Sequence, residues 1–557
     1  MEAICGRKSS LMDYLDRNLS ALSHLYPDFL ARLCEAFSDK HLLKQAEGQV
    51  SYVHGLSSYS LNLSSGSIFV LREAVPAAAE VLLAGVGLGE HLLTLIQDSS
   101  DEIIWHVWDD DPALWREALS RYDLRVAIFS GKLKPYLGID LVTHREQLST
   151  LPIVGHPILE HFYRLQLDFL KSDPRDKKCL LCEGELFVED IAQTLRHQGY
   201  AIYPWATNRL SLDEVKRCLE IYQPDLVMAV NFRKGLGEVS KLTNAPVVCW
   251  EIDPAVDTPP EAPEHCNGLH IFTYRRPHVE DYKSSGYPNV RFLPLATNPA
   301  TRHPLREAPD TPSPYRTSVS FVGASMLEQG RMLLQEFVNM YPSFLKPEAT
   351  PRHADEILGI LTTVIKKQRE DLSTYSLDHT LWEALPELKR PAPGTVDPEK
   401  LVSEICAAHK RMDWLESLAP QEIAVWGDTG WQESTELNYR GTAGHSQELT
   451  LIYSNSLINI DIGRLYQNDI MTMRLFDVMA CQGFLLTEYN DEIVKWFEPG
   501  VHLDVYRTPE ELAEKIQYYL QHPDKAHSIG QAAREKILEN HTFSKRFEEI
   551  FMNLGSD

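Results

Sequence analysis

Two arginines and two aspartates follow one apolar run late in the chain, and their types suit the binding of a nucleotide. The run Leu457–Ile460 precedes Arg464, Asp469, Arg474 and Asp477. We expect Asp477 to lie near a helix N-terminus. There a carboxylate can accept hydrogen bonds from the hydroxyls of a ribose, while backbone N–H groups face the phosphate. Arg474 offers a planar, forked donor for pyrophosphate oxygens. The alternative is a solvated helix face, and spacing alone does not decide between the two.

A second candidate is a glycine pattern between the apolar run Val81–Ala84 and a helical segment. Gly85, Gly87 and Gly89 would let the backbone approach a ligand, and the following helix N-terminus favours an anion. Asp109 ends the next apolar run about twenty residues later, where a ribose-binding acid would sit. The pattern is shorter than the full dinucleotide fingerprint, and such turns also serve packing alone. These four residues are therefore a candidate N-terminal nucleotide site, with a packing turn as the alternative.

Apolar runs that alternate with helical segments must position these residues. Such alternation predicts the α/β class, with parallel sheets covered by helices. From Lys178 onward the predicted strands are CLLC, YAIYPW, PDLVMAV, APVVCWEID, Ile271–Tyr274, Val290–Leu293, SVSFVGA, EIAVWGD, LINIDIG and FLLTEY. Before them we predict strands at Val81–Ala84, Ile103–Trp108, Leu124–Gly131 and 141–143, and short helices and turns over residues 1–65.

Linkers divide this pattern into domains. A charged segment lies at residues 173–178, and a segment rich in Pro and Thr lies at 297–315. The predicted organisation is an N-terminal Rossmann-like α/β domain (1–172), a lobe at 178–300, a lobe at 301–540 with a helical insertion at about 345–420, and a C-terminal helix at 541–557. We expect the N-terminal domain to fold separately.

Composition excludes several classes of protein. The 557 residues are 43% hydrophobic and 24% charged, as in globular proteins, and the net charge of −25 disfavours a nucleic-acid binder. Nine cysteines without framework spacing suit a reducing cytoplasm, and we expect Cys179 and Cys182 to be buried strand thiols. We expect no signal peptide and no transmembrane segment, because no apolar run is long enough. The predicted location is cytoplasmic.

From about residue 178 to 551 the sequence resembles the CgeB-like (spore maturation protein B) glycosyltransferases. The resemblance lies in six segments: WEIDP (Trp250–Pro254), FLPLATNP (Phe292–Pro299), FVGA with Arg331 downstream, LTLIYSNSLINI (Leu449–Ile460), RLFDVMACQGFLLTEYNDEIVKWFEPG (Arg474–Gly500), and EELAEKIQYYL followed by HTFSKR. It implies a GT-B fold, in which two facing Rossmann-like lobes hold acceptor and donor. The implied donor is a nucleotide-sugar (UDP-, GDP- or dTDP-sugar), and no cofactor or metal is required.

The resemblance also implies roles for single residues. Gly323 resembles the glycine that lets the backbone approach donor phosphates, and Arg331 and Arg474 resemble basic residues near the diphosphate. Related GT-B enzymes carry a Glu-x7-Glu pair, and Asp469 and Asp477 stand at that spacing. By this resemblance Asp477 binds the donor ribose, and Asp469, the catalytic candidate, lies near the transferred sugar.

Other residues and functions stay open. By the same resemblance Trp250 and Asp253 belong to the acceptor-lobe cleft, whereas His265, His270 and His278 are all candidates for a general base. The N-terminal third resembles nucleotide-fold regions ahead of sugar transferases in flagellar accessory proteins. The predicted function is therefore sugar transfer to a protein, such as flagellin, or to a surface glycan. The alternatives are an S-adenosylmethionine-dependent methyltransferase acting through the N-terminal domain and a catalytically silent GT-B scaffold.

Overall fold

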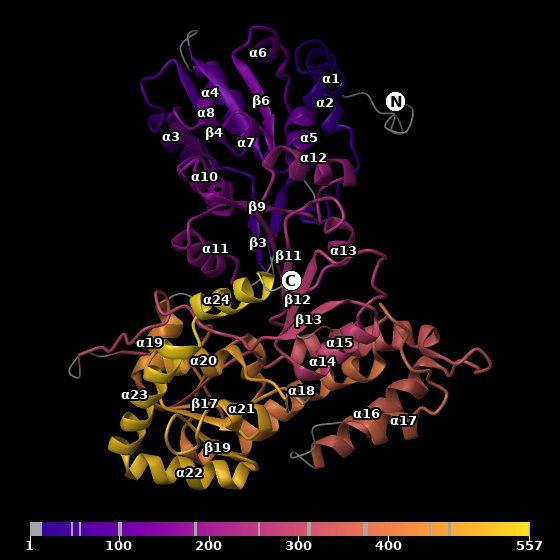
Figure 1. The fold of residues 1–557 in the computed structure, drawn as a ribbon, viewed down its shortest axis with the longest axis vertical. Helices are drawn as coiled ribbons and strands as arrows, with labels where there is room; N and C mark the ends of the chain where they lie inside the picture. Colours follow the sequence, from indigo (N-terminus) through magenta and orange to yellow (C-terminus); the bar gives the residue numbers. More distant parts are fainter. Residues whose placement is uncertain are drawn as a thin grey trace. The chain divides into compact units, whose positions relative to one another are not determined.

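The computed structural model describes residues 14–45, 48–54, 57–98, 103–182, 187–253, 255, 257–308, 313–370, 377–444, 447–465 and 469–555. The chain divides into two compact units, Met1–Val248 and Cys249–Asp557. Each contains parallel β-sheets, which confirms the predicted α/β class. Figure 1 colours the first unit from indigo to magenta and the second from magenta to yellow.

The first unit begins with two helices and an antiparallel sheet. The helices are α1 (Tyr14–Leu25) and α2 (Pro27–Leu33), and the sheet, of order β1-β2-β3, consists of β1 (Leu42–Lys44), β2 (Val50–His54) and β3 (Ser57–Ser60). The prediction of helices and turns is right for the helices and wrong for the strands. All residues of β3 are exposed, so the segment lacks the apolar alternation that would have marked it as a strand.

A four-stranded parallel sheet of order β6-β5-β4-β7 follows. Its strands are β4 (Glu80–Ala84), β5 (Ile104–Asp109), β6 (Leu133–Leu137) and β7 (Ile153–Gly155). The accompanying helices are α3 (Ser65–Glu73), α4 (Glu90–Asp98), α5 (Pro112–Arg121), α6 (Arg125–Phe129), α7 (Asp140–Thr143), α8 (Arg145–Leu148), α9 (Leu159–Phe162) and α10 (Arg164–Leu170).

Two of the predicted strands in this region are wrong. The run at 124–131 forms α6, and the run at 141–143 lies in α7. Val126 is 81% exposed, so the first run is not the buried strand that its composition indicates. Short apolar runs do not distinguish helix from strand by periodicity. The true strand β6 contains Pro135, which is tolerated because β6 is an edge strand.

The rest of the first unit matches the predicted alternation. Its elements are β8 (Lys177–Cys182), α11 (Val188–His197), β9 (Tyr200–Trp205), α12 (Leu212–Tyr222), β10 (Leu226–Val230) and α13 (Leu236–Val239). β8 pairs in parallel with β9 and β10. Cys179 and Cys182 are buried in β8 as free thiols, as predicted. The division between the units falls within β11 (Val247–Trp250).

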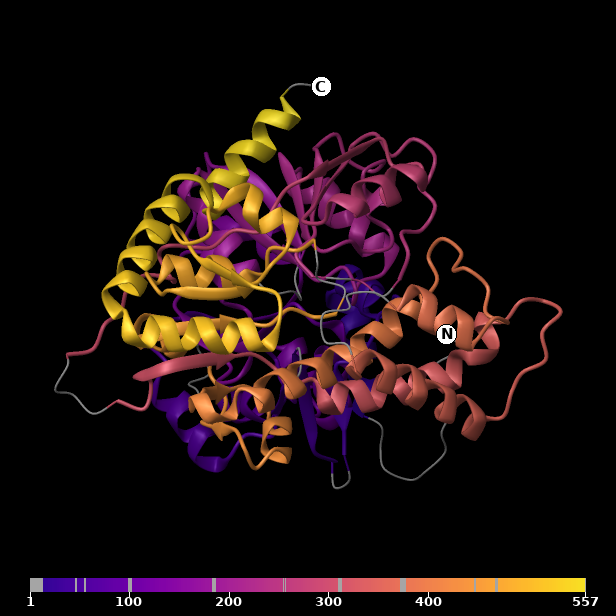
Figure 2. The same cartoon turned by 90° about the horizontal axis from the view of Figure 1, so that it is seen from below.

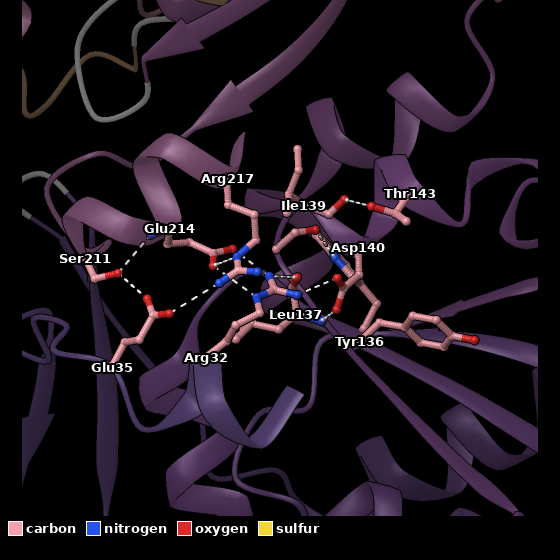
Figure 3. Close-up of polar contacts among 12 residues, drawn as sticks. Arg32, Glu35, Tyr136, Leu137, Ile139, Asp140, Thr143, Ser211, Glu214 and Arg217 are labelled. Carbon is pink, nitrogen blue, oxygen red and sulfur yellow. Dashed lines mark hydrogen bonds and ion pairs between the residues drawn. The ribbon is translucent and has the colours of Figure 1, made fainter. Parts of the chain in front are cut away.

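A buried ion network in the first unit joins α2 to α12 (Figure 3). Arg32 donates from Nε to Glu214 Oε2 at 3.0 Å and from Nη2 to Leu137 O at 2.6 Å. It also forms an ion pair with Asp140. The network crosses the predicted division at residues 172–178, because Glu214 lies beyond it and its partners lie before it.

The second unit contains a six-stranded parallel sheet of order β16-β15-β14-β17-β18-β19. Its strands are β14 (Thr317–Val322), β15 (Ala424–Trp426), β16 (Asn438–Tyr439), β17 (Ser456–Asp461), β18 (Leu485–Glu488) and β19 (Asp504–Tyr506). The predicted strands SVSFVGA, EIAVWGD, LINIDIG and FLLTEY are confirmed. Ahead of this sheet, β12 (Leu269–Thr273) and β13 (Asn289–Phe292) are parallel neighbours connected by α14 (Arg276–Ser284).

Helices occupy the predicted insertion and connect the later strands. Around the insertion lie α15 (Leu327–Met340), η3 (Tyr341–Phe344), α16 (Ala354–Glu370), α17 (Asp378–Ala384), α18 (Pro398–Ser417) and η4 (Ala419–Gln421). Helices α15 to α18 share one apolar core and lie together in Figure 1. The later helices are η5 (Thr429–Glu433), α19 (Gln447–Asn455), α20 (Met473–Ala480) and α21 (Asp491–Trp496).

The chain ends in three helices that line one side of the second unit. They are α22 (Pro509–Gln521), α23 (Pro523–Asn540) and α24 (Phe543–Leu554), drawn in yellow in Figure 2. In α24, Phe543 packs edge-to-face on Trp250, and Arg546 donates from Nε to Pro294 O at 2.8 Å. The last helix is thereby fastened to the segment that begins this unit.

Candidate functional site

Buried charged side chains gather at the carboxyl ends of β14 and β17 in the second unit. β14 comes first in the chain but lies in the middle of the sheet, with β15 and β16 on one side and β17 to β19 on the other. The chain therefore changes direction across the sheet between β14 and β17. In open parallel sheets, ligands bind outside the carboxyl ends of the strands at such a switch point.

Arg474 bridges the ends of these two strands. Its Nε donates to Val322 O of β14 at 2.7 Å, and its Nη1 forms an ion pair with Asp461 of β17. Burial lowers the pKa of Arg474, but the charge of Asp461, its hydrogen bond and the nearby Tyr453 and Tyr506 together raise it overall, so the side chain stays a cation. A Cβ atom on Gly323 would lie 2.7 Å from Arg474 Nη2. The absence of a side chain at Gly323 therefore makes room for the guanidinium.

Arg411 bridges the same two strand ends from α18. Its Nη1 donates to Ala324 O at 3.0 Å and its Nε to Ile462 O at 3.3 Å. Burial, together with the nearby cations Arg474 and Arg464, lowers the pKa of Arg411 to about 9. The sequence pattern does not single out Arg411, because an arginine inside a helical insertion looks like part of a solvated helix face.

Arg411, Arg464 and Arg474 form what we call the arginine cluster. Arg464 donates from Nη1 to Glu404 at 3.0 Å. Asp461 and Glu404 are the carboxylates whose charges act favourably on Arg411. The three guanidiniums thus gather around Asp461 and Glu404, and Arg411 itself donates hydrogen bonds to the backbone carbonyls of Ala324 and Ile462. Such a site attracts an anion.

The loop after β14 is held in place by the loop after β15. Trp431 Nε1 donates to Gly323 O at 2.8 Å. Asp428 Oδ1 accepts hydrogen bonds from Ser325 N at 3.2 Å and from Ser325 Oγ. Gly427 packs so tightly that a Cβ atom there would lie 2.1 Å from Gly323 O. The backbone at Gly323 is therefore fixed before any ligand binds.

Asp477 lies elsewhere on α20. Thr472 caps this helix, and Asp477 is its fifth residue, buried and with both oxygens bonded. Oδ1 accepts from Thr297 Oγ1 at 2.6 Å, and Oδ2 accepts from Arg302 Nε at 3.1 Å. The structure thus gives Asp477 two protein partners within the predicted linker region. Its predicted role toward ribose stays a prediction.

The other predicted donor residues lie apart from the arginine cluster. Arg331 on α15 is exposed and pairs with Glu433 at 2.6 Å. Asp469, the catalytic candidate, forms a two-pronged ion pair with Arg275, at 2.7 Å to Nη2 and 3.1 Å to Nε. Of the predicted donor residues, the structure brings together Gly323 and Arg474.

The two acceptor-lobe residues differ in exposure. Trp250 is fully buried and packs edge-to-face on Phe543 and Phe547 of α24. Asp253 lies two residues after Glu251 and is exposed. The buried indole of Trp250 therefore packs against α24.

The N-terminal glycine turn is filled by protein side chains. Cβ atoms on Gly85 and Gly87 would lie 2.8 and 2.6 Å from His156. Asp109 is fully buried and accepts from Val86 N at 2.7 Å and Tyr163 Oη at 2.6 Å. Burial, with a smaller contribution from the charge of Asp111, raises the pKa of Asp109 to about 7. These contacts favour the packing turn, and the nucleotide site stays a prediction.

Within the part of the chain that the structure describes, no group of three or more His, Cys, Asp or Glu side chains could hold a metal ion. No helix there is both long enough and apolar enough to cross a membrane.

Comparisons with known proteins place this arginine cluster in a recognised segment. Residues 409–552 match the family described as glycosyl transferase-like. This match contains Arg411, Arg464 and Arg474, so the predicted resemblance to glycosyltransferases is confirmed over this segment. No curated protein matches the chain.

Solved structures of glycosyltransferases are similar at low identity. A glycosyltransferase from Rickettsia africae ESF-5 is 12% identical, with a TM-score of 0.37 over 68% of this chain and 98% of that one. Anabaena HepE in complex with UDP and glucose is 11% identical, with a TM-score of 0.36 over 68% and 100%. Sucrose-phosphate synthase from Thermosynechococcus elongatus is 12% identical, with a TM-score of 0.38 over 68% and 99%.

Proposed function

We propose that this protein is a glycosyltransferase of GT-B architecture that binds the diphosphate of a nucleotide-sugar at the arginine cluster. The observation that carries the proposal is the position of Arg411, a buried guanidinium that bridges Ala324 O and Ile462 O beside Arg464 and Arg474. A bound diphosphate would supply the negative charge that this position lacks. The match of residues 409–552 to glycosyl transferase-like proteins supports the same assignment.

The chemistry of sugar transfer explains why such a cluster is useful. An acceptor oxygen forms a bond to the anomeric carbon, and the bond from that carbon to the diphosphate oxygen breaks. The leaving nucleoside diphosphate takes the electron pair, so negative charge develops on its oxygens. Arg474 and Arg411 are fixed before the reaction by carbonyls at the ends of β14 and β17, so they can stabilise this charge without reorganising.

The finer assignments are part of the proposal. We assign the donor to the UDP-, GDP- or dTDP-sugars and the acceptor to a protein, such as flagellin, or to a surface glycan, with the reaction in the cytoplasm and no metal required. The CgeB-like resemblance supports these assignments. No observation favours the methyltransferase alternative, because His156 fills the glycine turn on which it depends.

A binding experiment tests the proposal. Isothermal titration of the full chain with UDP, GDP, dTDP and S-adenosylmethionine should show binding of at least one nucleoside diphosphate. Arg411→Gln and Arg474→Gln should each weaken it tenfold to a hundredfold, since a charge-assisted hydrogen bond contributes about 1.5–3 kcal/mol. Arg369→Gln is the matched control, because this arginine pairs with Asp413 on the surface of α16 and α18.

The alternatives predict different outcomes of the same titration. Binding of S-adenosylmethionine alone would support the methyltransferase. Absence of binding by every nucleotide would support the silent scaffold. Either result would contradict the proposed function.

A further inference from the structure

We propose that a cavity in the first unit binds a sugar that carries a single phosphate. The cavity has a volume of about 750 Å³, within the range of about 300–1,000 Å³ that is typical of small-molecule sites. Its lining includes residues of α7, α8, α10, β8 and β9 and the last residue of α12. None of these residues belongs to the arginine cluster, so the site goes beyond the proposed function.

The cavity lies beside the charged segment that the sequence predicts as a linker between domains. Asp173 and Asp176 of this segment line it, together with Ser172 just before them. Helices α7, α8 and α10 precede the segment, and β8, β9 and α12 follow it. A ligand in the cavity therefore contacts both parts of the first unit, and such junctions are common places for small-molecule sites.

Arg145 on α8 is fixed in place but keeps hydrogen-bond donors for a ligand. Its Nη2 donates to Ser172 O and, at 3.1 Å, to Ser172 Oγ. Its guanidinium carbon lies 4.7 Å from the centroid of the Phe169 ring, which is 3% exposed. Within the part of the chain that the structure describes, Arg145 forms no ion pair with a carboxylate. Its Nε and Nη1 atoms are therefore available as donors.

Lys178 at the start of β8 brings a second cation to the same cavity. Its Nζ lies 6.0 Å from the centroid of the Tyr222 ring, and the Tyr222 hydroxyl is fixed by a hydrogen bond of 2.7 Å to Ala201 O. Phe169 and Tyr222 pack edge-to-face, with 5.7 Å between their centroids. Among the described residues, Lys178 Nζ forms no ion pair either. The two cations thus lie beside neighbouring rings and without carboxylate partners.

A phosphate monoester matches this pair of cations. The planar guanidinium of Arg145 can donate two hydrogen bonds to phosphate oxygens, and the ammonium of Lys178 adds a point charge. Because Ser172 already holds Arg145, little conformational freedom is lost on binding.

The acidic residues of the lining favour a ligand that also carries hydroxyl groups. Asp173 is engaged by Arg175, which donates from Nε at 3.0 Å and from Nη2 at 2.6 Å. These bonds, and to a smaller extent the charge of Arg145, lower the pKa of Asp173. Glu146 and Asp176 also line the cavity. Their carboxylates would repel a polyphosphate, whereas they can accept hydrogen bonds from the hydroxyls of a sugar.

The aromatic residues of the lining disfavour a nucleotide. A base binds a protein mainly by stacking on an aromatic face or by hydrogen bonds to its edge. Here Phe169 has the Arg145 guanidinium over its ring, and Tyr222 has the Lys178 ammonium near its ring. A base would have to displace a cation from these faces, and a sugar would not.

Isothermal titration of the full chain with glucose 6-phosphate tests the proposal, beside glucose, inorganic phosphate and uridine monophosphate. Glucose 6-phosphate should bind at least tenfold more tightly than each of the other three. Arg145→Gln and Lys178→Gln should each weaken its binding at least tenfold, as the loss of a charge-assisted hydrogen bond does. Lys177→Gln is the matched control, because its Nζ lies 5.8 Å from the Tyr200 ring and outside the cavity lining.

Two further measurements separate this site from the arginine cluster and from an effect on folding. Arg474→Gln should leave the affinity for glucose 6-phosphate unchanged. The melting temperature of each variant without ligand shows whether it folds, and Lys178→Gln leaves the bond between Arg145 and Ser172 intact.

Four outcomes would overturn the proposal. They are absence of binding by glucose 6-phosphate, equal or tighter binding of inorganic phosphate or uridine monophosphate, an unchanged affinity in the folded cavity variants, and a loss in Arg474→Gln as large as in those variants.

Discussion

Two buried arginines, one in each unit, stand in opposite electrostatic environments. Arg32 is hydrogen-bonded to Glu214 and paired with Asp140, and although burial lowers its pKa, these two carboxylates raise it overall (Figure 3). Arg411 donates hydrogen bonds to the carbonyls of Ala324 and Ile462, and burial and neighbouring cations lower its pKa to about 9. The charge of the first arginine is balanced by carboxylates that pair with it, whereas the second is held by neutral carbonyls beside two further arginines.

The sheet that contains β4 and the sheet that contains β14 also differ in charge. Each carries a glycine after that first strand. In the first unit β4 lies between β5 and β7, and in the second β14 lies between β15 and β17, so both sheets have a switch point. At the first, His156 fills the space, and burial lowers its pKa well below the usual value, which keeps the ring neutral. At the second, Arg474 fills it as a cation. The strand order places a switch point in each sheet. The charge of the side chain that lies there then decides whether an anion can bind.

Arg32→Ala should have the largest effect on stability. It leaves the half-buried Asp140 without the guanidinium and the buried Glu214 with Arg217 as its remaining cation, and breaking a buried pair typically costs about 3–5 kcal/mol. We expect about 5 kcal/mol from urea unfolding, with nucleotide affinity unchanged. Arg164→Ala, which removes an exposed pair with Glu189, should hardly change stability. Loss of nucleotide binding in Arg32→Ala would contradict the comparison, because it would give the balanced arginine a role in the site.

Asp477→Ala should destabilise the second unit by about 3–4 kcal/mol, because it breaks the buried ion pair between Asp477 and Arg302. The measurement pairs a melting temperature with a titration of nucleoside diphosphate. If Asp477 only holds Thr297 and Arg302, the melting temperature falls and the dissociation constant stays the same. If Asp477 binds ribose as well, the dissociation constant rises tenfold or more. Asp477→Asn keeps the shape and serves as the milder companion variant.

The sequence predicts some parts of the site better than others, for physical reasons. β14 and β17 carry buried apolar residues, Val319 and Phe321 in the first and Ile458 and Ile460 in the second, so the two strands are predictable from the sequence. Gly323 directly follows the first strand, and Arg474 lies in the first turn of α20, the helix after the second. Arg411 is not predictable, because its partners Ala324 and Ile462 lie 87 and 51 residues away. No local pattern encodes such contacts. Asp477 is predictable as a residue of importance, but its partner Arg302 lies 175 residues away.

The same change at two glycines should have two different consequences. Gly87→Ala places a Cβ atom 2.6 Å from His156 at a φ of +50°, so it should destabilise the first unit by about 1–3 kcal/mol. Gly323→Ala places one 2.7 Å from Arg474 Nη2, and the guanidinium must move. We expect donor affinity to fall about tenfold, as for one weakened charge-assisted hydrogen bond. Equal donor affinities in Gly87→Ala and Gly323→Ala would contradict the proposal that the donor binds beside Gly323 and not beside Gly87.

Arg331→Gln should have the smallest effect, although its resemblance to a diphosphate-binding residue is as clear in the sequence as that of Arg474. Its side chain is 64% exposed and paired with Glu433, which is itself 48% exposed, so water and salt already screen its charge. An arginine so placed competes weakly for a diphosphate, whereas Arg411 and Arg474 act where water is excluded. We expect an unchanged dissociation constant and an unchanged melting temperature, measured beside Arg474→Gln at the same ionic strength. A tenfold loss of affinity in Arg331→Gln would show that the donor extends over α15, and the arginine cluster would then be one part of a larger diphosphate site.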